Sequence, residues 1–592
     1  MESFVSDKFE SSGWFKDLFI IAALSAILYL SLAFVRPLAS PDEGRYSEIP
    51  REMVAGGDYV SPTLNGMAYF YKPPMFYWMQ AASIKCFGIN LVSLRLANSG
   101  MAILGILMTY CAARSLFGRL AGMASAAVLS TSVLYFALGQ IVTLDMTVSV
   151  FITGAMFSFI TALRKEGLAR GLLTLSFFAM CAFAVMSKGL IGVLIPSAII
   201  FFYAMFTGVF SFLKSLKLSD FWWAAAGVVL FAAIAVPWHV LAAMANPPYP
   251  SAEGIFSKNW EGQGFFWYYI VHEHFLRYID ADTSMRAQPW WFFFVFAIVG
   301  MIPWAIIAPR AFADAFSGGT AKFFREKKEL AFMLVWAVFV VLFFSVSKSK
   351  LVPYIIPIFP ALAVVIGVWV AKVWANPQAY KLKIESALFV VLGYAIAAAP
   401  FIIYFVLDRK GKLYEHSEMA ALCAVMTAVL AAAASFALYA NLKMGRRAFM
   451  AAVFAAVFCL LMFFNPLGKF LQRPSAQPLA EAYLKIRKDG DKIFVGINYG
   501  AFQDLPVWLN DVVLMIGGPP EEQKYGYMRA REKNGKRFFE TGAELRGFVA
   551  GMKGAAYLAV RNDEFPAVKE MTGAKFTEIA RNRDLVLYKM SF

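Results

Sequence analysis

The sequence predicts an α-helical protein that spans a membrane many times and ends in a small α/β domain. Its 592 residues are 60% hydrophobic and only 16% charged, whereas a soluble domain carries about 25% charged residues. Apolar runs of roughly 20 residues, the length that crosses a bilayer as a helix, recur along most of the chain. The last part of the chain differs, because short strand-like runs alternate there with polar segments. This combination excludes a large soluble enzyme.

About thirteen runs are long and apolar enough to be transmembrane helices. The run near 189–211 is interrupted by Gly189, Gly192 and Pro196, so we expect a broken helix there. The expected spans lie near 17–36, 93–113, 120–138, 146–163, 170–187, 189–211, 222–245, 289–308, 329–346, 351–372, 384–407, 418–441 and 448–466.

Basic residues in the short loops indicate the orientation of these spans. If the N-terminus is cytoplasmic, six basic loops fall on the cytoplasmic side, as the positive-inside rule requires. One basic group falls outside on this count, and it consists of Arg409, Lys410 and Lys412. An odd number of spans then places the C-terminal segment outside.

Three outside segments are long or polar enough to carry a functional site. They are the loops 37–92 and 246–288 of a transmembrane domain over 1–466, and an α/β domain over 467–592. Strand-like runs in that domain lie at 492–497, 512–517, 555–560 and 585–590, and helical segments lie near 476–487 and 542–552. Thr541 and Glu544 open the second of these helices with the spacing of a capping box.

Several functional classes are disfavoured by motifs that the sequence lacks. No P-loop and no G-x-G-x-x-G after a strand is present, so ATP-driven transport is not expected. The net charge of +16 is assigned mainly to cytoplasmic loops, without the basic stripe of a nucleic-acid-binding domain. The five cysteines have no paired spacing, so we expect neither a disulfide framework nor a zinc knuckle. Chemistry outside the membrane then requires an activated donor within it, such as a lipid-linked group.

The first outside loop is dense in charged and aromatic residues directly after the first span. Its first charged residues are Asp42, Glu43 and Arg45. We expect a short helix capped by Ser47, with Tyr46, Ile49 and Met53 as an apolar underside resting on the membrane. Its polar face would then be turned toward solvent or a cavity. The alternative is a solvated interfacial loop in which Tyr and Trp are residues of the aromatic belt.

Further ionisable residues lie at the outside edge of the expected membrane domain. They are Asp145, Lys188, Lys348 and Lys350, and they join Asp42 and Lys72 on one face. Ionisable groups in such places are costly and usually mark a functional site. We therefore expect these carboxylates and amines to converge on a cavity that handles an anionic substrate.

A metal site is a weaker possibility in the second outside loop. His272 and His274 flank Glu273 in the run YYIVHEHFLRY, which also contains Arg277. Two histidines with a carboxylate are too few ligands for a strong prediction. A divalent metal therefore stays open, and no other cofactor is expected.

The run PDEGRYSEIPREMVAGGDYV followed by GMAYFYKPPMFYW resembles the first periplasmic loop of the bacterial aminoarabinose transferases that modify lipid A. Further similar runs are LGQIVTLDMT, SKG at 187–189, FWYYIVHEHFLRY, SKSKLVPYIIPIFPALA, SAQPLAEAYLK and FQDLPVWLND. That family lies in the GT-C glycosyltransferase superfamily with the protein O-mannosyltransferases. The resemblance implies a GT-C type membrane fold in the bacterial inner membrane. It also implies inverting transfer of 4-amino-4-deoxy-L-arabinose from undecaprenyl phosphate to lipid A on the periplasmic face.

The same resemblance implies roles for particular residues. Asp42 matches the family's catalytic aspartate, and Asp145 matches a second acidic position. Donor-phosphate binding is implied for Lys72, Arg45 and Arg277. Positions that would line the cavity are Glu43, Tyr46, Tyr69, Tyr71, Lys188, His272, Lys350 and Tyr354. The family commonly has a Glu directly before the lysine, where this chain has Tyr71, so the sugar specificity and any metal ligand at that position stay open.

Two alternatives to lipid A modification are a different acceptor for the same reaction and a lipid transporter. The same polyprenyl-phosphate chemistry could act on a protein hydroxyl or another envelope glycan, since the first-loop motif does not define the acceptor. A lipid transporter is disfavoured, because transporters more often show symmetric halves with paired broken helices near the midplane. Here the charged residues gather toward one face, which favours an enzyme.

Overall fold

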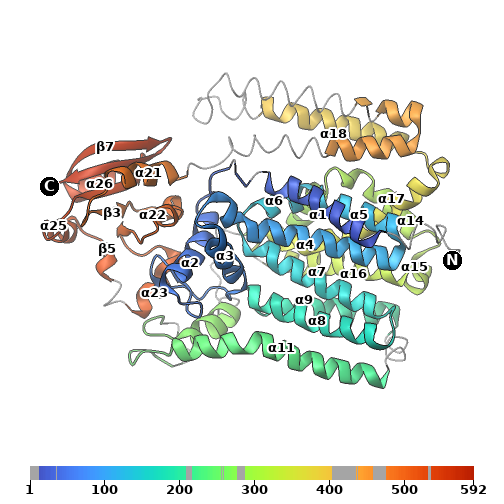
Figure 1. The fold of residues 1–592 in the computed structure, drawn as a ribbon, viewed down its shortest axis with the longest axis horizontal. Coiled ribbons are helices and arrows are strands. Elements are labelled where there is room, and N and C mark those ends of the chain that lie inside the picture. The colour runs from blue at the N-terminus through green and yellow to red at the C-terminus, as the bar shows by residue number, and fades with distance from the viewer. Residues whose placement is uncertain are drawn as a thin grey trace.

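The protein is a bundle of apolar helices with a mixed α/β domain at one end (Figure 1). The computed structural model describes residues 13–31, 33–34, 36–208, 217–254, 257, 259–276, 287–347, 349–402, 435–436, 438–457, 475–530 and 535–592. Within those residues, six helices are long and apolar enough to cross a membrane, or seven if the bent pair α5–α6 counts as one span. The polytopic helical fold is therefore confirmed, while the total of about thirteen spans stays a prediction.

The first half of the bundle follows the expected spans closely. Its helices are α1 (Trp14–Leu30), α4 (Leu91–Phe117), α5 (Arg119–Ser130), α6 (Val133–Gln140), α7 (Leu144–Ala162), α8 (Gly167–Lys188), α9 (Ile191–Thr207) and α11 (Leu218–Ala245). The expected span 120–138 is broken, because α5 and α6 meet at an angle of 61°. The break expected near Gly189 falls between α8 and α9, and α9 then continues through Pro196.

The second half of the bundle contains more interruptions than the sequence suggests. Its elements are α13 (Phe292–Gly300), η3 (Trp304–Ile306), α14 (Ala308–Ala315), α15 (Thr320–Glu326), α16 (Lys328–Val346), η4 (Val352–Ile358), α17 (Phe359–Ala375), η5 (Pro377–Ala379), α18 (Lys383–Ile402) and η7 (Ala440–Met444). The expected span 289–308 is not one helix, since α13 ends before Pro303, which lacks an amide hydrogen to continue the ladder. The expected span 418–441 lies mostly outside the described residues.

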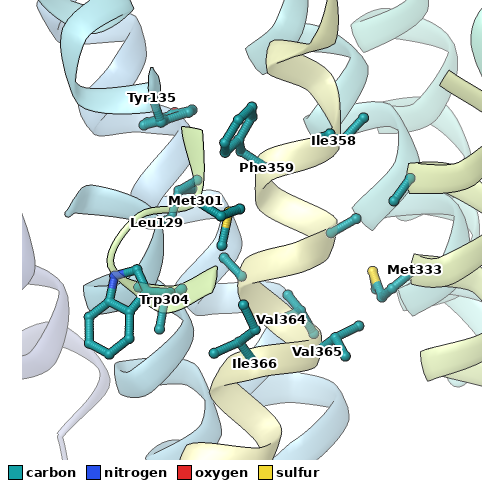
Figure 2. Close-up of a cluster of buried hydrophobic side chains, with 14 of the residues drawn as sticks. Leu129, Tyr135, Met301, Trp304, Met333, Ile358, Phe359, Val364, Val365 and Ile366 are labelled. Atoms are coloured by element: carbon teal, nitrogen blue, oxygen red, sulfur yellow. The ribbon is translucent and has the colours of Figure 1, made fainter. Parts of the chain in front are cut away.

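The bundle core is formed around α17, which packs against α5 and α16. Figure 2 shows Phe359, Val364 and Ile366 of α17 facing Leu129 and Trp304. All of these side chains are buried, and the indole of Trp304 donates a hydrogen bond to Thr131 Oγ1 at 2.9 Å. A core that is dry and closely packed gives the outside loops a rigid base.

The C-terminal domain is a six-stranded sheet with strand order β5-β4-β3-β6-β8-β7. Strands β3 (Lys492–Val495), β4 (Leu514–Ile516), β5 (Phe538–Phe539) and β6 (Ala556–Arg561) are parallel, and β7 (Lys575–Asn582) and β8 (Leu585–Ser591) complete one edge in antiparallel fashion. The remaining elements are α21 (Gln477–Ile486), η8 (Tyr499–Phe502), α22 (Leu505–Leu509), α23 (Glu521–Arg529), η9 (Gly535–Arg537), α25 (Gly542–Ala550) and α26 (Phe565–Thr572). The four expected strands and both expected helices are present, including the capping box at Thr541. The expected domain boundary at 467 lies outside the described residues.

The first and second outside loops lie between the bundle and this domain (Figure 1). The first loop forms α2 (Asp42–Gly56), the hairpin β1 (Thr63–Leu64) and β2 (Met67–Ala68), and α3 (Met75–Phe87). The second loop forms the π-helix η2 (Phe266–Leu276). Helix α2 begins at Asp42, earlier than the expected cap at Ser47, and it packs against α3 and α22. Protein therefore covers part of the helix surface that was expected to face solvent or a cavity, although Asp42 is exposed.

Candidate functional site

The position of α2 is fixed by Glu43, the second residue of the helix. Its fully buried carboxylate pairs with Arg36 at 2.7 Å and with Arg95 at 3.2 Å, and it accepts the backbone amides of Ala39 and Val142. Burial on its own would raise the pKa of Glu43, but Arg95 and Arg36 hold that pKa below its usual value. Glu43 therefore anchors α2 to α4 and to the segment before α7, and does not border open space.

Asp42 precedes this anchor and points the other way. Its side chain is 62% exposed, and its nearest cation is Arg45, one turn along, at 3.9 Å. The guanidinium of Arg45 is largely buried and donates from Nε to Gln503 Oε1 of the C-terminal domain at 3.1 Å. The carboxylate of Asp42 is thus presented on a fixed helical turn and remains accessible.

Asp145 and Lys188 meet at the end of the bundle nearest α2. Asp145 lies in the first turn of α7 and Lys188 is the last residue of α8, and their side chains form an ion pair. The amine of Lys188 also lies 4.5 Å from the ring centre of Tyr354 on η4. The structure therefore brings together three predicted site residues from three separate elements.

Tyrosines connect this ion pair to the turn that carries Asp42. Burial raises the pKa of the Tyr46 phenol well above its usual value, and Tyr69, Asp42 and Asp145 add to the shift while Arg45 opposes it. Tyr46 also packs in one hydrophobic cluster with Tyr69, Tyr71 and Leu144, the residue before Asp145. The ring of Tyr69 in turn lies 4.8 Å from that of Tyr71. The predicted tyrosines thus line one continuous region.

Lys72 extends this region toward the second loop. Its amine lies 3.6 Å from Glu273 Oε2 and its side chain is 26% exposed, so the amine can still meet a ligand. Glu273 Oε1 lies 3.6 Å from His272 Nδ1. Tyr268 stacks on the His272 ring with centroids 5.1 Å apart, and Tyr71 meets Tyr268 edge-on at the same spacing. Aromatic rings of Tyr71, Tyr268 and His272 therefore pack next to the Lys72–Glu273 pair.

The second loop offers few ligands for a metal. His272 and Glu273 give two donor groups, and the side chain of His274 lies outside the described residues. Across the part of the chain that the structure describes, no group of three His, Cys, Asp or Glu side chains is arranged to hold an ion. The described residues alone do not make a metal site, and a metal requirement stays a prediction.

Three other predicted residues are not placed within this region. Lys350 is buried, and its amine donates to the backbone carbonyls of Gln288 and Ser347, so it joins two loops. Arg277 and Lys348 lie outside the described residues. Their predicted roles are therefore neither supported nor opposed by the geometry.

Sequence reasoning missed the site contacts of several residues that the structure brings together. Glu273 is the carboxylate partner of Lys72, although its position between two histidines suggested a metal ligand. Tyr77 on α3 is fully buried, and its ring packs on Tyr46 with centroids 6.4 Å apart. Gln503 reaches the site from the C-terminal domain, and no local sequence pattern links it with Arg45.

Comparisons with known proteins agree with this arrangement. The family model for dolichyl-phosphate-mannose-protein mannosyltransferase matches residues 71–240. The undecaprenyl phosphate-alpha-4-amino-4-deoxy-L-arabinose arabinosyl transferase of Pectobacterium atrosepticum is 31% identical over 386 residues. The resemblance to the aminoarabinose transferases is confirmed. The alignment spans 64% of this chain and 64% of that relative, which is less than two thirds of its length.

Two solved structures of one protein, ArnT, share the fold along nearly the whole chain. ArnT from Cupriavidus metallidurans in the apo state superposes with a TM-score of 0.75 at 22% identity, covering 97% of each chain. The same protein bound to undecaprenyl phosphate gives a TM-score of 0.74 at the same identity and coverage. The apolar spans and this similarity indicate a multi-span protein of the bacterial inner membrane.

Proposed function

We propose that this protein transfers 4-amino-4-deoxy-L-arabinose from undecaprenyl phosphate to a phosphate of lipid A, with inversion, at the periplasmic face of the inner membrane. One observation carries the proposal. The accessible Asp42, the Asp145–Lys188 pair and the Lys72–Glu273 pair come from separate elements and adjoin tyrosines that pack against one another. The similarity to named aminoarabinose transferases supports the identity of the sugar and of its carrier.

The basic residues would act on the leaving group. Breaking the bond between C1 of the sugar and the phosphate oxygen leaves a polyprenyl phosphate, so negative charge develops on that oxygen. Lys72 can stabilise this charge as a point cation, and Arg45 can add directed hydrogen bonds. Both cations are already held next to carboxylates or amides, so little reorganisation is needed when phosphate binds. Arg277 is proposed as a further phosphate ligand from the resemblance alone.

The two acidic residues would have different tasks. The side chain of Asp42 is mostly exposed, and its ion-pair partner Arg45 lies 3.9 Å away. Asp145, by contrast, is paired with Lys188 and largely buried. Asp42 is therefore the carboxylate that can approach a sugar and stabilise an oxocarbenium-like transition state. Asp145 would keep Lys188 in place at the membrane edge. A lipid A phosphate is already anionic, so the attack on C1 does not require a general base.

The test is mass spectrometry of lipid A from cells with and without the protein, and from cells that carry Asp42→Asn. We expect a pentosamine increment on lipid A phosphate with the wild-type protein and its loss in the variant, at equal protein amounts in the membrane. The same lipid A mass profile in all three strains would refute the proposal that lipid A is the acceptor. The pentosamine increment should then be sought on proteins and on other envelope glycans. Full transfer by the Asn variant would remove Asp42 from the mechanism.

A further inference from the structure

A buried carboxylate of the C-terminal domain is bonded to the segment that leads into α2. Ser40 Oγ donates to Asp504 Oδ1 at 2.9 Å, although these residues are 464 positions apart in the sequence. The other oxygen, Oδ2, accepts Ser475 Oγ at 2.5 Å and the amide of Ala476 at 2.9 Å. Asp504 is fully buried and Ser40 nearly so. A buried carboxylate with all these donors is held in one orientation.

The backbones of α2 and of the segment around Asp504 also touch. A Cβ placed on Gly44 would lie 2.4 Å from the amide nitrogen of Asp504 and 2.5 Å from the carbonyl carbon of Gln503. Only glycine allows this approach. One residue further on, Arg45 Nε donates to Gln503 Oε1. Ser40, Gly44 and Arg45 therefore bracket Asp42 with three contacts to one short segment of the C-terminal domain.

The rest of the first loop is tied to the same domain at further points. Arg51 donates to Asn510 Oδ1 at 3.2 Å. The side chain of Asn65, in the turn between β1 and β2, exchanges two hydrogen bonds with the backbone of Val513, at 3.0 and 2.9 Å. Arg537 then donates to the carbonyl of Asn65 at 2.6 Å. The domain is thus docked along the loop, and the contact at Asp504 is the one that meets the turn bearing Asp42.

We propose that Asp504 is a positioning residue for glycosyl transfer, which holds through Ser40 the helical turn that presents Asp42. This inference rests on the proposed function. Asp504 does not touch the reacting groups, because its oxygens are bonded to Ser40, Ser475 and Ala476. The C-terminal domain then contributes to the reaction without supplying a catalytic side chain.

Loss of this contact should affect turnover more than donor binding. A displacement of about 1 Å at a catalytic group can lower a rate by roughly 100-fold. The two proposed phosphate ligands, Lys72 and Arg45, by contrast keep contacts with Glu273 and Gln503 that do not pass through Ser40. The kcat for transfer should therefore fall when the contact is broken, while the KM for the undecaprenyl-phosphate donor should stay nearly constant.

The experiment compares Ser40→Ala with Ser83→Ala in the purified full-length protein. Both serines are buried and each donates a single hydrogen bond to an acceptor elsewhere, but Ser83 bonds to the carbonyl of Ser93 between α3 and α4. We expect Ser40→Ala to lower kcat roughly tenfold or more, with the donor KM within about twofold. Ser83→Ala should keep kcat near the wild-type value, although its Tm should fall about as much as that of Ser40→Ala. Deuterium uptake by the amides of α2 should increase in Ser40→Ala only.

Three outcomes would overturn the inference. One is an equal fall of kcat in both serine variants, which would mean that stability alone is responsible. The second is faster deuterium uptake in α2 with unchanged kcat. The double variant of Ser40→Ala with Asp504→Ala should lose no more activity than Asp504→Ala alone, and additive losses are the third such outcome. If the wild-type protein transfers no aminoarabinose at all, the proposed function fails, whereas the deuterium uptake still decides whether Asp504 holds the turn.

Discussion

Lys72 shows how a single residue can report on donor binding. Its amine is held near Glu273 at 3.6 Å and remains partly exposed, so a phosphate could bind it without breaking buried structure. Lys72→Gln should weaken binding of undecaprenyl phosphate by roughly 10-fold to 100-fold, since a hydrogen bond to a charged group contributes about 1.5–3 kcal/mol. The measurement is a binding titration of the purified protein with undecaprenyl phosphate. Lys85→Gln is the matched control, because Lys85 lies on α3 over the ring of Tyr59. Equal affinities of the two variants for undecaprenyl phosphate would show that Lys72 does not bind the phosphate.

Asp145 and Lys188 allow a structural role to be separated from a chemical one. Both side chains are mostly buried at the membrane edge, and removing one partner of such a pair leaves an unpaired charge at a cost of about 3 kcal/mol. Asp145→Asn should therefore lower Tm clearly, and the double variant with Lys188→Met should recover part of the loss. Thermal unfolding followed in detergent measures both. Purely additive losses would show that the pair is not coupled.

At the scale of elements, α2 shows where sequence reasoning was right and where it could not reach. The amphipathic pattern predicted a helix with Ile49 and Met53 on its buried face, and both side chains are buried. Its polar face was predicted to meet solvent or a cavity; Asp42 is exposed, whereas the Arg45 side chain is largely buried against the C-terminal domain. Gly44 and Arg45 meet Gln503 and Asp504, which are more than 450 positions away, and such contacts leave no local pattern.

The other elements that sequence reasoning missed have a similar cause. Strand β7 carries charged residues on an exposed edge of the sheet, so it lacks the apolar alternation that predicts a strand. The residues of α13 and η3 read as one apolar run, because hydropathy does not respond to a single proline at position 303. The ion pairs of the site likewise depend on packing. The sequence predicted Asp145 and Lys188 separately, and only the fold pairs them.

The close approach of α2 to the C-terminal domain leads to a prediction about Gly44. Gly44→Ala places a methyl group against backbone atoms that have no room to move aside, and such overpacking costs about 1–3 kcal/mol. We expect a lower Tm together with lower transfer activity. Gly56→Ala is the control on the same helix, since a Cβ there meets nothing within 4 Å. Equal behaviour of the two variants would contradict the packing seen between α2 and Asp504.

The protonation of Asp504 gives a second test of the same contact. Burial raises the pKa of Asp504 above its usual 3.8, although hydrogen bonds from Ser475, Ser40 and Ala476 oppose the shift. The folded state then holds the proton more tightly than the unfolded chain. Protonated Asp504 therefore contributes its full share of the folding free energy below the usual pKa of 3.8. That share is lost as the pH rises through the raised pKa of the folded state. On acidification from neutral pH toward the usual pKa of 3.8, the Tm of the wild type should rise relative to that of Asp504→Asn. A relative fall would mean that the hydrogen bonds outweigh burial.

For the whole molecule, the arrangement of charge and domains makes sense only with one orientation in the membrane. Basic residues such as Arg114 and Arg119 bind Asp17 at the end of the bundle away from the C-terminal domain. The candidate site and the α/β domain lie together at the opposite end (Figure 1). In the proposed orientation, a donor carried by a membrane lipid would reach that end from within the bilayer, and a lipid A acceptor would lie on the same side.

Labelling of single cysteines tests this orientation directly. In a background with the five native cysteines of the sequence replaced by serine, Lys485→Cys on α21 should react with a membrane-impermeant maleimide in intact spheroplasts. Lys322→Cys on α15 should react only after lysis, because α15 lies at the basic end of the bundle (Figure 1). Both lysines are exposed, so a difference in labelling reports the side of the membrane and not burial. The reverse pattern would place the α/β domain and the carboxylate of Asp42 in the cytoplasm. An active site there would be separated from lipid A acceptors on the periplasmic face.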